Sequence, residues 1–159
     1  MKLALAQINP TVGDLTGNTQ KILAFIATAK SQKADLIIFP ELAITGYPPE
    51  DLLLKPQFVT DNLSALQAIV KQCKGLAAYV GFVDKKGKDL FNAGAFVENG
   101  KTRKIYHKVH LPNYAVFDEK RYFKAGKEAV IKFLIGMAMK ATEGSADPKV
   151  VEKLLRSKI

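Results

Sequence analysis

Two charged residues stand where an α/β protein commonly places catalytic groups, and Glu41 is the first. It follows the apolar stretch 35–39 and Pro40, and functional side chains of α/β sheets ordinarily lie at the carboxyl ends of buried strands. A carboxylate there is partly removed from water, which makes it usable as a general base. The competing interpretation is an ordinary loop or helix-start glutamate, and spacing alone favours that interpretation.

The second candidate, Lys108, ends a strand-like segment at residues 101–107, shortly before Leu111 and Pro112. An ammonium group at that point can stabilise a developing oxyanion and help to hold a nearby carboxylate. Because many lysines crowd this part of the chain, composition by itself favours a solvated surface role for Lys108.

The two histidines and the single cysteine offer weaker chemistry. His107 and His110 are three residues apart at a strand-to-loop junction, which does not place both rings on one face, so we expect no metal site. Cys73 falls on the apolar face of an expected helix, beside Leu66 and Ile69, as structural cysteines do. We therefore do not expect it to be a nucleophile.

Apolar periodicity predicts the elements that position these residues. The expected strands are 3–8, 35–39, 76–83, 90–98 and 101–107. One helix is expected to begin after residue 18, and a second is expected at 56–73. We expect Asn18 or Thr19 to cap the first helix and Asn99–Gly100 to form a hairpin turn. The order β-α-β-α-β-β-β indicates an α/β fold with a mixed sheet. Residues 108–128 lack a clear period and are expected to form a long loop.

Charge and hydropathy narrow the class of protein. The 159-residue chain carries 24 Lys and Arg against 15 Asp and Glu, a formal net charge of +9. Residues 101–132 hold nine of these basic residues and three of the acidic ones, which indicates a solvated loop or local attraction of an anionic substrate or partner. No apolar run reaches the roughly 20 residues that span a bilayer, so we expect a cytoplasmic protein with no membrane partner.

Two longer motifs surround the candidate residues. Residues 39–52 read Phe-Pro-Glu-Leu-Ala-Ile-Thr-Gly-Tyr-Pro-Pro-Glu-Asp-Leu, and residues 106–123 read Tyr-His-Lys-Val-His-Leu-Pro-Asn-Tyr-Ala-Val-Phe-Asp-Glu-Lys-Arg-Tyr-Phe. They resemble the first two catalytic motifs of the nitrilase (carbon–nitrogen hydrolase) superfamily. Their combination is similar in particular to the N-terminal glutaminase domain of glutamine-dependent NAD(+) synthetases. This resemblance covers residues 1 to about 130 and implies a truncated nitrilase-type α-β-β-α sandwich.

The resemblance also implies roles for individual residues. In that family a glutaminase releases ammonia from glutamine through a thioester. Carried over by motif, Glu41 would be the base, Lys108 the oxyanion partner and Glu119 the additional glutamate near the lysine. Tyr114 would contact the glutamine, with Phe117 close to the same pocket. The ammonia would pass to a separate synthetase domain that binds ATP and the nicotinate dinucleotide, so we expect no cofactor in this chain.

One departure from the family pattern affects the chemistry. The family's nucleophilic cysteine follows the lysine, in a Cys-Glu-Asp context, whereas no cysteine lies between Lys108 and Ile159. Cys73 precedes the lysine and cannot replace it. Without a thiol no thioester forms, so we expect this chain to be catalytically incomplete, with the second half of the sandwich and the synthetase domain also missing.

The end of the chain resembles different proteins. Residues 133–151 resemble the C-terminal end of the tRNA-dependent amidotransferase B subunit and of the YqeY-type helical protein. We therefore expect two domains, a partial glutaminase domain at 1–131 and a helical hairpin at 132–159, in a recombinant, rearranged or engineered chain. The competing interpretation is a hairpin that caps the truncated sandwich and whose similarity is chance.

Two functions outside catalysis stay open. The basic stretch 101–132 and the tail could form an RNA- or protein-binding module, with tRNA as a weakly supported partner. An exposed sheet face or edge could instead pair with another chain and produce a homo-oligomer.

Overall fold

A single five-stranded sheet organises the part of the chain that the computed structural model describes, which is residues 1–126, 135–136, 138–139 and 146–158. Its strands, in their order across the sheet, are β1 (Leu3–Leu5), β2 (Leu36–Ile38), β3 (Ala77–Lys86), β4 (Asp89–Glu98) and β5 (Lys101–His107). The first three run parallel, and β4 and β5 continue as an antiparallel meander. The expected α/β fold with a mixed sheet is confirmed.

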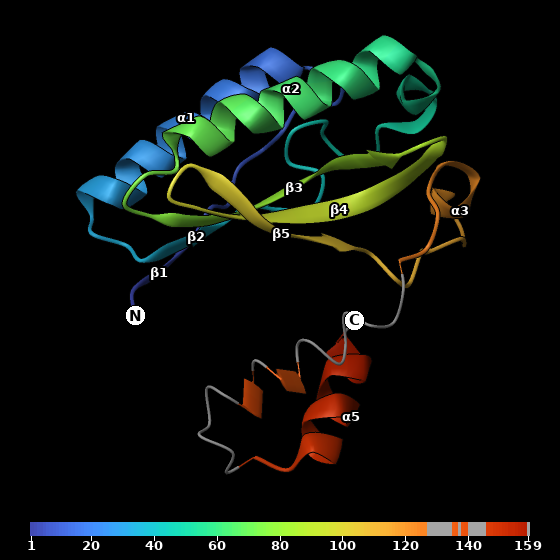
Figure 1. Ribbon diagram of the computed structural model, residues 1–159. Helices are drawn as coiled ribbons and strands as arrows, with labels where there is room; N and C mark the ends of the chain where they lie inside the picture. Colours follow the sequence, from blue (N-terminus) through green and yellow to red (C-terminus); the bar gives the residue numbers. More distant parts are fainter. Residues whose placement is uncertain (127–134, 137, 140–145, 159) are drawn as a thin grey trace.

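Two long helices cover one face of this sheet. Helix α1 (Leu15–Ser31) connects β1 to β2, and α2 (Pro56–Gln72) connects β2 to β3 after the short 3-10 helix η1 (Glu50–Leu54). Parallel strands need such crossovers, and crossovers of the same hand that advance in one direction place both helices on the same side. Figure 1 shows α1 and α2 side by side above the sheet.

Helix α1 begins earlier than the sequence predicted. Asp14, not Asn18 or Thr19, caps it, and the Asp14 carboxylate accepts the backbone N–H of Gly17 at 2.9 Å. Asn18 is fully buried and hydrogen-bonds both backbone groups of Thr11 and the carbonyl of Ile44. A buried amide of this kind must find partners, and here it ties the loop before α1 to the segment that follows β2.

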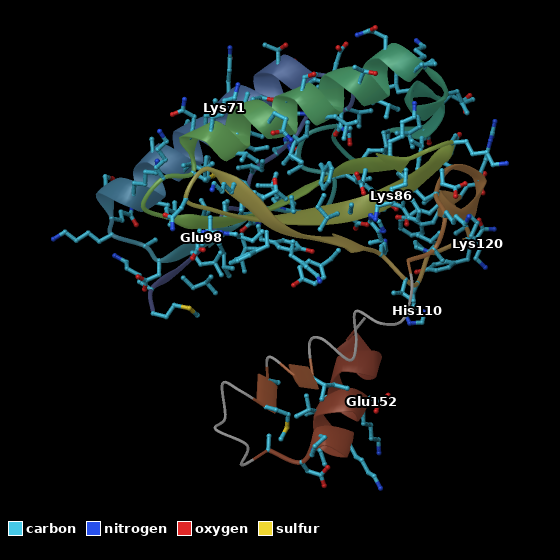
Figure 2. All side chains as sticks on the ribbon, in the orientation of Figure 1. Lys71, Lys86, Glu98, His110, Lys120 and Glu152 are labelled. Carbon is cyan, nitrogen blue, oxygen red and sulfur yellow. The ribbon has the colours of Figure 1, made fainter. Side chains whose placement is uncertain are left out.

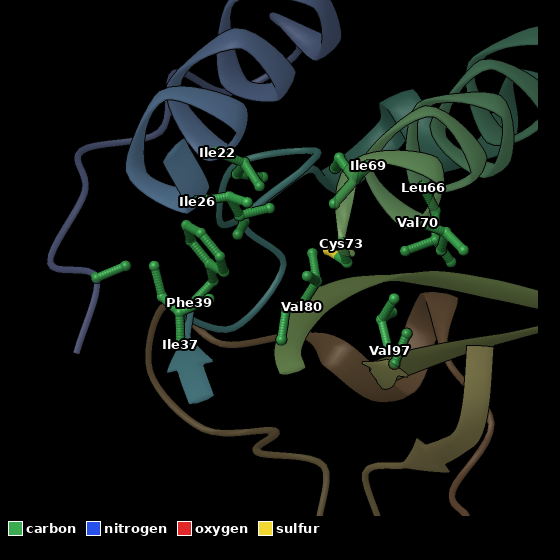
Figure 3. Packing of buried hydrophobic residues seen from close by; sticks show 14 of the residues in the cluster. Ile22, Ile26, Ile37, Phe39, Leu66, Ile69, Val70, Cys73, Val80 and Val97 are labelled. Carbon is green, nitrogen blue, oxygen red and sulfur yellow. The ribbon is translucent and has the colours of Figure 1, made fainter. Parts of the chain in front are cut away.

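The hydrophobic core fills the space between the helices and the sheet. Figure 3 shows Ile22 and Ile26 of α1 and Ile69 of α2 above Ile37 and Val80 of the strands, and each of the five is at most 2% exposed. Burying one such side chain contributes roughly 1.5–3 kcal/mol. This core therefore fixes the positions of the strand ends, where the candidate site lies.

Tight turns connect the strands of the meander. Asn99 and Gly100 both have positive φ, so the predicted hairpin turn between β4 and β5 is confirmed. The β3–β4 hairpin is longer than predicted, because pairing continues to Lys86 and Asp89, around a turn in which Gly87 has φ +60°.

The other face of the sheet carries larger side chains. Since side chains alternate along a strand and Ala4, Ala78 and Val80 belong to the core, Leu3, Leu5 and Tyr79 point to the opposite face. Leu3 is 46% and Leu5 73% exposed. Within the described residues there is one sheet, so a second sheet of an α-β-β-α sandwich does not cover this face there.

The tail contains the helix predicted at its end. Helix α5 spans Pro148–Lys158, and the Asp147 carboxylate caps it by accepting the N–H of Lys149 at 2.7 Å. Residues 135–136 and 138–139 are also helical. The domain junction expected at 131–132, and the turn of the predicted hairpin, lie outside the described residues. None of the described helices is long and apolar enough to cross a bilayer.

Candidate active site

The turn after β2 places Glu41. Its neighbours Leu42 and Ile44 are fully buried, and the N–H of Ile44 donates to the carbonyl of Gly81 on β3. A Cβ at Gly81 would stand 2.4 Å from the carbonyl oxygen of Pro40, which is closer than side chains tolerate. The absence of a side chain at Gly81 therefore lets the turn lie directly on β3 and sets where Glu41 begins.

The end of β5 places Lys108. The backbone N–H of Lys108 donates to the carbonyl of Asn92 on β4 at 2.8 Å, and its own carbonyl accepts from Gly126 at 2.8 Å. A Cβ at Gly126 would lie 2.4 Å from the carbonyl oxygen of His107. The lysine backbone is thus held on both sides, and its side chain extends from a fixed point.

The loop expected at 108–128 contains a short helix, α3 (Glu119–Tyr122). Its first residue, Glu119, accepts the N–H of Phe123 on its backbone carbonyl, and its own N–H donates to the carbonyl of Pro112. Phe123 is 5% exposed and packs with Leu42 and Leu53. This small apolar cluster draws α3 against the body of the domain and brings Glu119 to Lys108.

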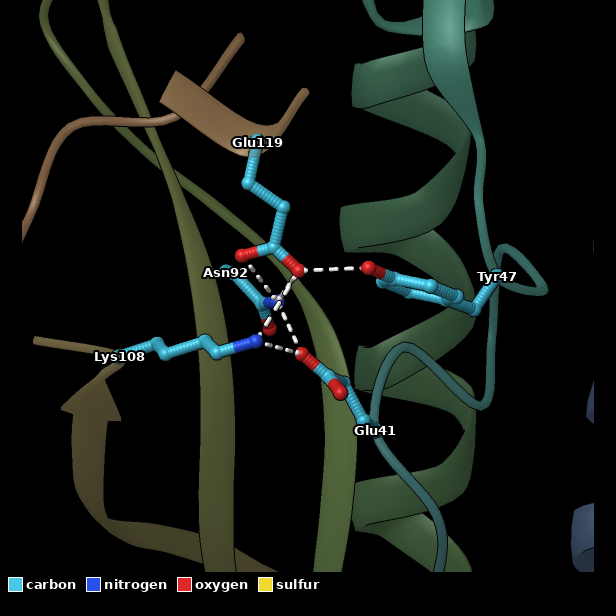
Figure 4. A network of polar contacts seen from close by, with 5 residues as sticks. All are labelled: Glu41, Tyr47, Asn92, Lys108 and Glu119. Atoms are coloured by element: carbon cyan, nitrogen blue, oxygen red, sulfur yellow. Dashed lines mark hydrogen bonds and ion pairs between the residues drawn. The ribbon is translucent and has the colours of Figure 1, made fainter. Parts of the chain in front are cut away.

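Figure 4 shows how the two carboxylates meet the ammonium group. Lys108 Nζ lies 2.7 Å from Glu41 Oε1 and 3.0 Å from Glu119 Oε1. The hydroxyl of Tyr47 donates to the same Glu119 oxygen at 2.9 Å. The side-chain amide of Asn92 donates to Glu41 Oε1 at 2.5 Å and lies 3.5 Å from each Glu119 oxygen. Four separate segments of the chain, namely the turn after β2, strand β4, the end of β5 and helix α3, therefore converge on one polar cluster.

The surroundings shift the protonation of two of these groups. Burial lowers the pKa of the Lys108 ammonium, but the hydrogen bonds and charges of Glu41 and Glu119 outweigh it, and the net shift is upward. Burial, followed by the hydrogen bond to Glu119, raises the pKa of Tyr47 well above its ordinary value. Lys108 is thus held as a cation and Tyr47 as a neutral donor.

The two carboxylates differ strongly in exposure. The Glu41 side chain is 44% exposed, whereas that of Glu119 is 5% exposed. Glu41 is partly removed from water, as expected, because Lys108 and Asn92 contact its carboxylate, but a large part of the group still faces solvent. The more strongly desolvated carboxylate is Glu119.

The residues expected to contact substrate line the approach to this cluster. Tyr114 is 67% exposed, and its ring meets the edge of Phe117 with centroids 5.4 Å apart. Phe117 in turn lies 6.3 Å from the Tyr47 ring. A cavity of about 220 Å³, lined by Tyr47, Phe117, Glu119 and Arg121 among others, opens beside them. The structure brings all five predicted site residues into one region, and their catalytic roles stay predictions.

The histidines are engaged elsewhere. His107 Nε2 lies 2.7 Å from Asp84 Oδ2 and its ring stacks on Phe91 at 4.1 Å. His110 lines an open hollow beside Lys108. In the described part of the chain, no group of three or more His, Cys, Asp and Glu side chains is placed to hold a metal ion.

Cys73 lies far from the polar cluster. Its carbonyl accepts the N–H of Gly100, which precedes β5, whereas Lys108 follows the last residue of β5. Seven extended residues span about 23 Å, so the thiol is at the opposite end of that strand. Cys73 is fully buried, and burial raises its pKa although the charge of Lys30 opposes this. A buried thiol of this kind is a core residue.

Sequence reasoning missed Asn92 and Tyr47. Asn92 is 4% exposed and is the one uncharged polar side chain in the strand Asp-Leu-Phe-Asn-Ala-Gly-Ala-Phe-Val-Glu. An amide among apolar strand residues needs a partner, and that signal could have drawn attention to it. Tyr47 carried no such signal, because its aromatic ring fits an ordinary packing role equally well.

Comparison with known proteins supports a family assignment. The family described as carbon-nitrogen hydrolase matches residues 2–146. The chain is 42% identical over 133 residues to the glutamine-dependent NAD(+) synthetase of Thermotoga maritima, covering 82% of this chain and 23% of that protein. It is 45% identical over 124 residues to the enzyme of the same name from Xanthomonas campestris, covering 77% and 22%. The chain thus spans about a quarter of the length of these curated relatives.

Solved structures of related proteins support the same family assignment. The glutamine-dependent NAD+ synthetase of Acinetobacter baumannii superposes with a TM-score of 0.75 at 42% identity, over 79% of this chain and 24% of that one. An amidase of Nesterenkonia, from the nitrilase superfamily, superposes with a TM-score of 0.70 at 26% identity, over 80% and 49%. The comparisons give no support to the resemblance of residues 132–159 to the amidotransferase B subunit. The fold, the motifs and the matched residues together establish that this chain belongs to the carbon–nitrogen hydrolase family.

Proposed function

We propose that these residues form the proton-handling and oxyanion-stabilising part of a site that hydrolyses the side-chain amide of glutamine. One observation carries the proposal: the Lys108 ammonium lies within 3.0 Å of two carboxylates, Glu41 and Glu119, that belong to different segments of the chain. A fixed cation beside an exposed carboxylate suits acyl transfer, because the first stabilises an oxyanion and the second accepts a proton.

The different exposures of the two carboxylates fit different roles. The exposed Glu41 can meet a nucleophile and take its proton. Glu119, buried and hydrogen-bonded to Tyr47, instead holds Lys108 in position and in its charged form. Tyr114 and Phe117 stand at the open side of the cluster, where the amide substrate would enter.

The nucleophile of such a reaction must come from outside these 159 residues. The one cysteine of the chain, Cys73, is buried at the far end of β5. A solved structure of the Nesterenkonia amidase carries acrylamide added at its active-site cysteine, which supports a thiol nucleophile in this family. The chain by itself is therefore proposed to release no ammonia.

Glutamine is the proposed substrate because the relatives that share the motifs are glutamine-dependent NAD(+) synthetases. ATP and the nicotinate dinucleotide are proposed to bind a separate synthetase domain and not these residues. A cytoplasmic location stays a prediction.

The test is a fusion in which residues 1–126 of this chain replace the matching part of the Thermotoga maritima enzyme. We expect this fusion to release ammonia from glutamine and the unfused chain to release none. Lys108→Met in the fusion should abolish release. Turnover by the unfused chain that survives Cys73→Ala would overturn the proposed mechanism, as would a folded fusion that binds glutamine but releases no ammonia.

An RNA- or protein-binding module remains the second candidate, and the charge distribution favours it less. Arg103 pairs with Glu98 at 3.2 Å, and Arg121 pairs with Asp51 at 3.3 Å. Glu98 and Lys120 lie at opposite ends of the sheet in Figure 2. The basic residues of 101–124 are thus divided between two regions and partly neutralised.

A gel-shift assay with tRNA across salt concentrations tests this alternative. Binding should weaken steeply with salt if several phosphates are contacted, and absence of binding at low salt would eliminate it. Self-association through the exposed Leu3 and Leu5 face is tested by light scattering, in which a strictly monomeric species would exclude a homo-oligomer.

A further inference from the structure

One uncharged residue, Asn92, contacts both carboxylates of the polar cluster and the backbone of its lysine. Asn92 donates from Nδ2 to Glu41 Oε1 at 2.5 Å and lies 3.5 Å from both oxygens of Glu119. Its backbone carbonyl accepts the N–H of Lys108 at 2.8 Å. Asn92 thus contacts the two carboxylates with its side chain and the lysine with its backbone (Figure 4).

The position of Asn92 is fixed more firmly than that of the groups it contacts. Strand β4 is paired on both sides, and Asn92 stands opposite Val83 of β3 while the next residue, Ala93, stands opposite His107 of β5. Asn92 is 4% exposed. Glu41 lies on a turn and is partly exposed, so it needs an external contact to hold its carboxylate in one place.

The amide suits this role because it donates without adding charge. Two carboxylates that share one ammonium repel each other, and a neutral donor between them offsets part of this repulsion and leaves the net charge of the cluster unchanged. A carboxylate in place of the amide would add a third negative charge, and an apolar side chain would supply no donor.

We propose that Asn92 is a positioning residue, which holds the Glu41 carboxylate against Lys108 in the geometry required for proton transfer. The proposal rests on the proposed function only in naming Glu41 as the proton acceptor. The geometric part concerns this chain alone and can be tested on it directly.

The chain offers a matched control in Asn62 of α2. This buried asparagine donates to the carbonyl of Val83 at 2.7 Å and accepts the N–H of Val83 at 3.3 Å. Val83 is the residue opposite Asn92 in the sheet. Asn62→Leu therefore removes a buried amide from the same part of the molecule without removing a contact to either carboxylate.

Nuclear magnetic resonance of the full chain provides the decisive measurement. In the unsubstituted protein we expect the two side-chain amide protons of Asn92 to shift when the carboxylates are protonated, and Glu41→Gln to shift the proton that faces Glu41. Because two carboxylates hold the Lys108 ammonium, we also expect its protons to exchange slowly enough to be observed. We expect Asn92→Leu to broaden or abolish this signal and Asn62→Leu to retain it. Asn92 amide protons that respond to neither pH nor Glu41→Gln would overturn the proposal, as would an unchanged Lys108 signal in a folded Asn92→Leu protein.

Two further measurements cover a variant that does not fold and a fusion that is inactive. If Asn92→Leu does not fold, the response of the native Asn92 amide to Glu41→Gln still gives the answer. In the fusion described above, we expect Asn92→Leu to lower kcat about tenfold or more with little change in KM, because misplacing a reacting group slows the chemical step; an unchanged kcat would contradict the positioning role. If the unsubstituted fusion releases no ammonia, the proposed function fails while the resonance measurement still decides the role of Asn92.

Discussion

Glu41 and Glu119 contact the same ammonium group from opposite kinds of surroundings. Glu41 stands on a turn after β2 with its side chain 44% exposed, and Glu119 begins α3 with its side chain 5% exposed. A carboxylate that is buried without a cation destabilises the folded state much more than an unpaired carboxylate at the surface. The comparison supports the proposed division of roles, in which Glu119 holds Lys108 and Glu41 is accessible to a reacting group.

Removing the shared cation should have the largest effect. Lys108→Met leaves Glu119 buried without an opposite charge, and we expect the free energy of unfolding to fall by about 2–4 kcal/mol. Urea denaturation at neutral pH measures this loss. Glu119→Gln in the same protein should recover part of it, because the uncompensated charge is then removed, whereas Glu41→Gln should recover little. Equal recovery by the two second substitutions would contradict the difference between the carboxylates.

Neutralising the buried carboxylate comes next. Glu119→Gln keeps the size of the side chain but loses the ionic hydrogen bond to Lys108, and we expect a loss of about 1–2 kcal/mol by urea denaturation. Glu119→Gln should also lower the pKa of Tyr47, because this pKa is raised first by burial and then by the Glu119 carboxylate. Tyrosinate absorbance as a function of pH, with Tyr47→Phe as the reference, follows that change.

Removing the tyrosine hydroxyl should have a smaller effect that depends on pH. Tyr47→Phe loses one hydrogen bond to Glu119, worth about 1 kcal/mol. Because the pKa of Tyr47 is raised by folding, the stabilisation is fully present below the unfolded pKa of about 10 and is lost as pH rises through the folded value. The stability gap between the unsubstituted protein and Tyr47→Phe should therefore narrow in strongly alkaline solution, and a constant gap would refute this account.

Neutralising the exposed carboxylate should change stability least. We expect Glu41→Gln to stay within about 0.5 kcal/mol of the unsubstituted protein, since exposed ion pairs contribute little. The same substitution in the fusion should abolish ammonia release if Glu41 is the base. A large loss of stability with activity retained would reverse the roles of the two carboxylates.

Much of the fold follows from local sequence patterns. The strands of the meander and helix α2 lie within a few residues of their predicted bounds because their apolar periodicity is strong, and Asn99–Gly100 has the conformation its residue types require. The start of α1 did not follow, because Asp14 and Asn18 are both good caps and only the tertiary contacts of Asn18 with Thr11 and Ile44 decide between them.

The candidate site was predictable in its charged members and not in its neutral ones. Glu41, Lys108 and Glu119 belong to motifs, but their meeting depends on a parallel crossover and on a short helix whose four residues show no period. Asn92 reaches the cluster because of the register in which β4 pairs with β3 and β5, and no local sequence pattern specifies that register. The exposure of Glu41 depends on which way its turn packs on Gly81, and this again is a tertiary property.

The two ways in which strands are connected imply an order of assembly for the polar cluster. Asn92 lies on β4 and Lys108 directly follows β5, and a two-residue turn joins these two strands, so the contact is between near neighbours in the chain. Glu41 is connected to them through the longer crossover that includes α2, and contacts of long sequence separation form more slowly. We therefore expect the lysine and its amide neighbour to meet early in folding, and the carboxylate on the β2 turn to arrive last.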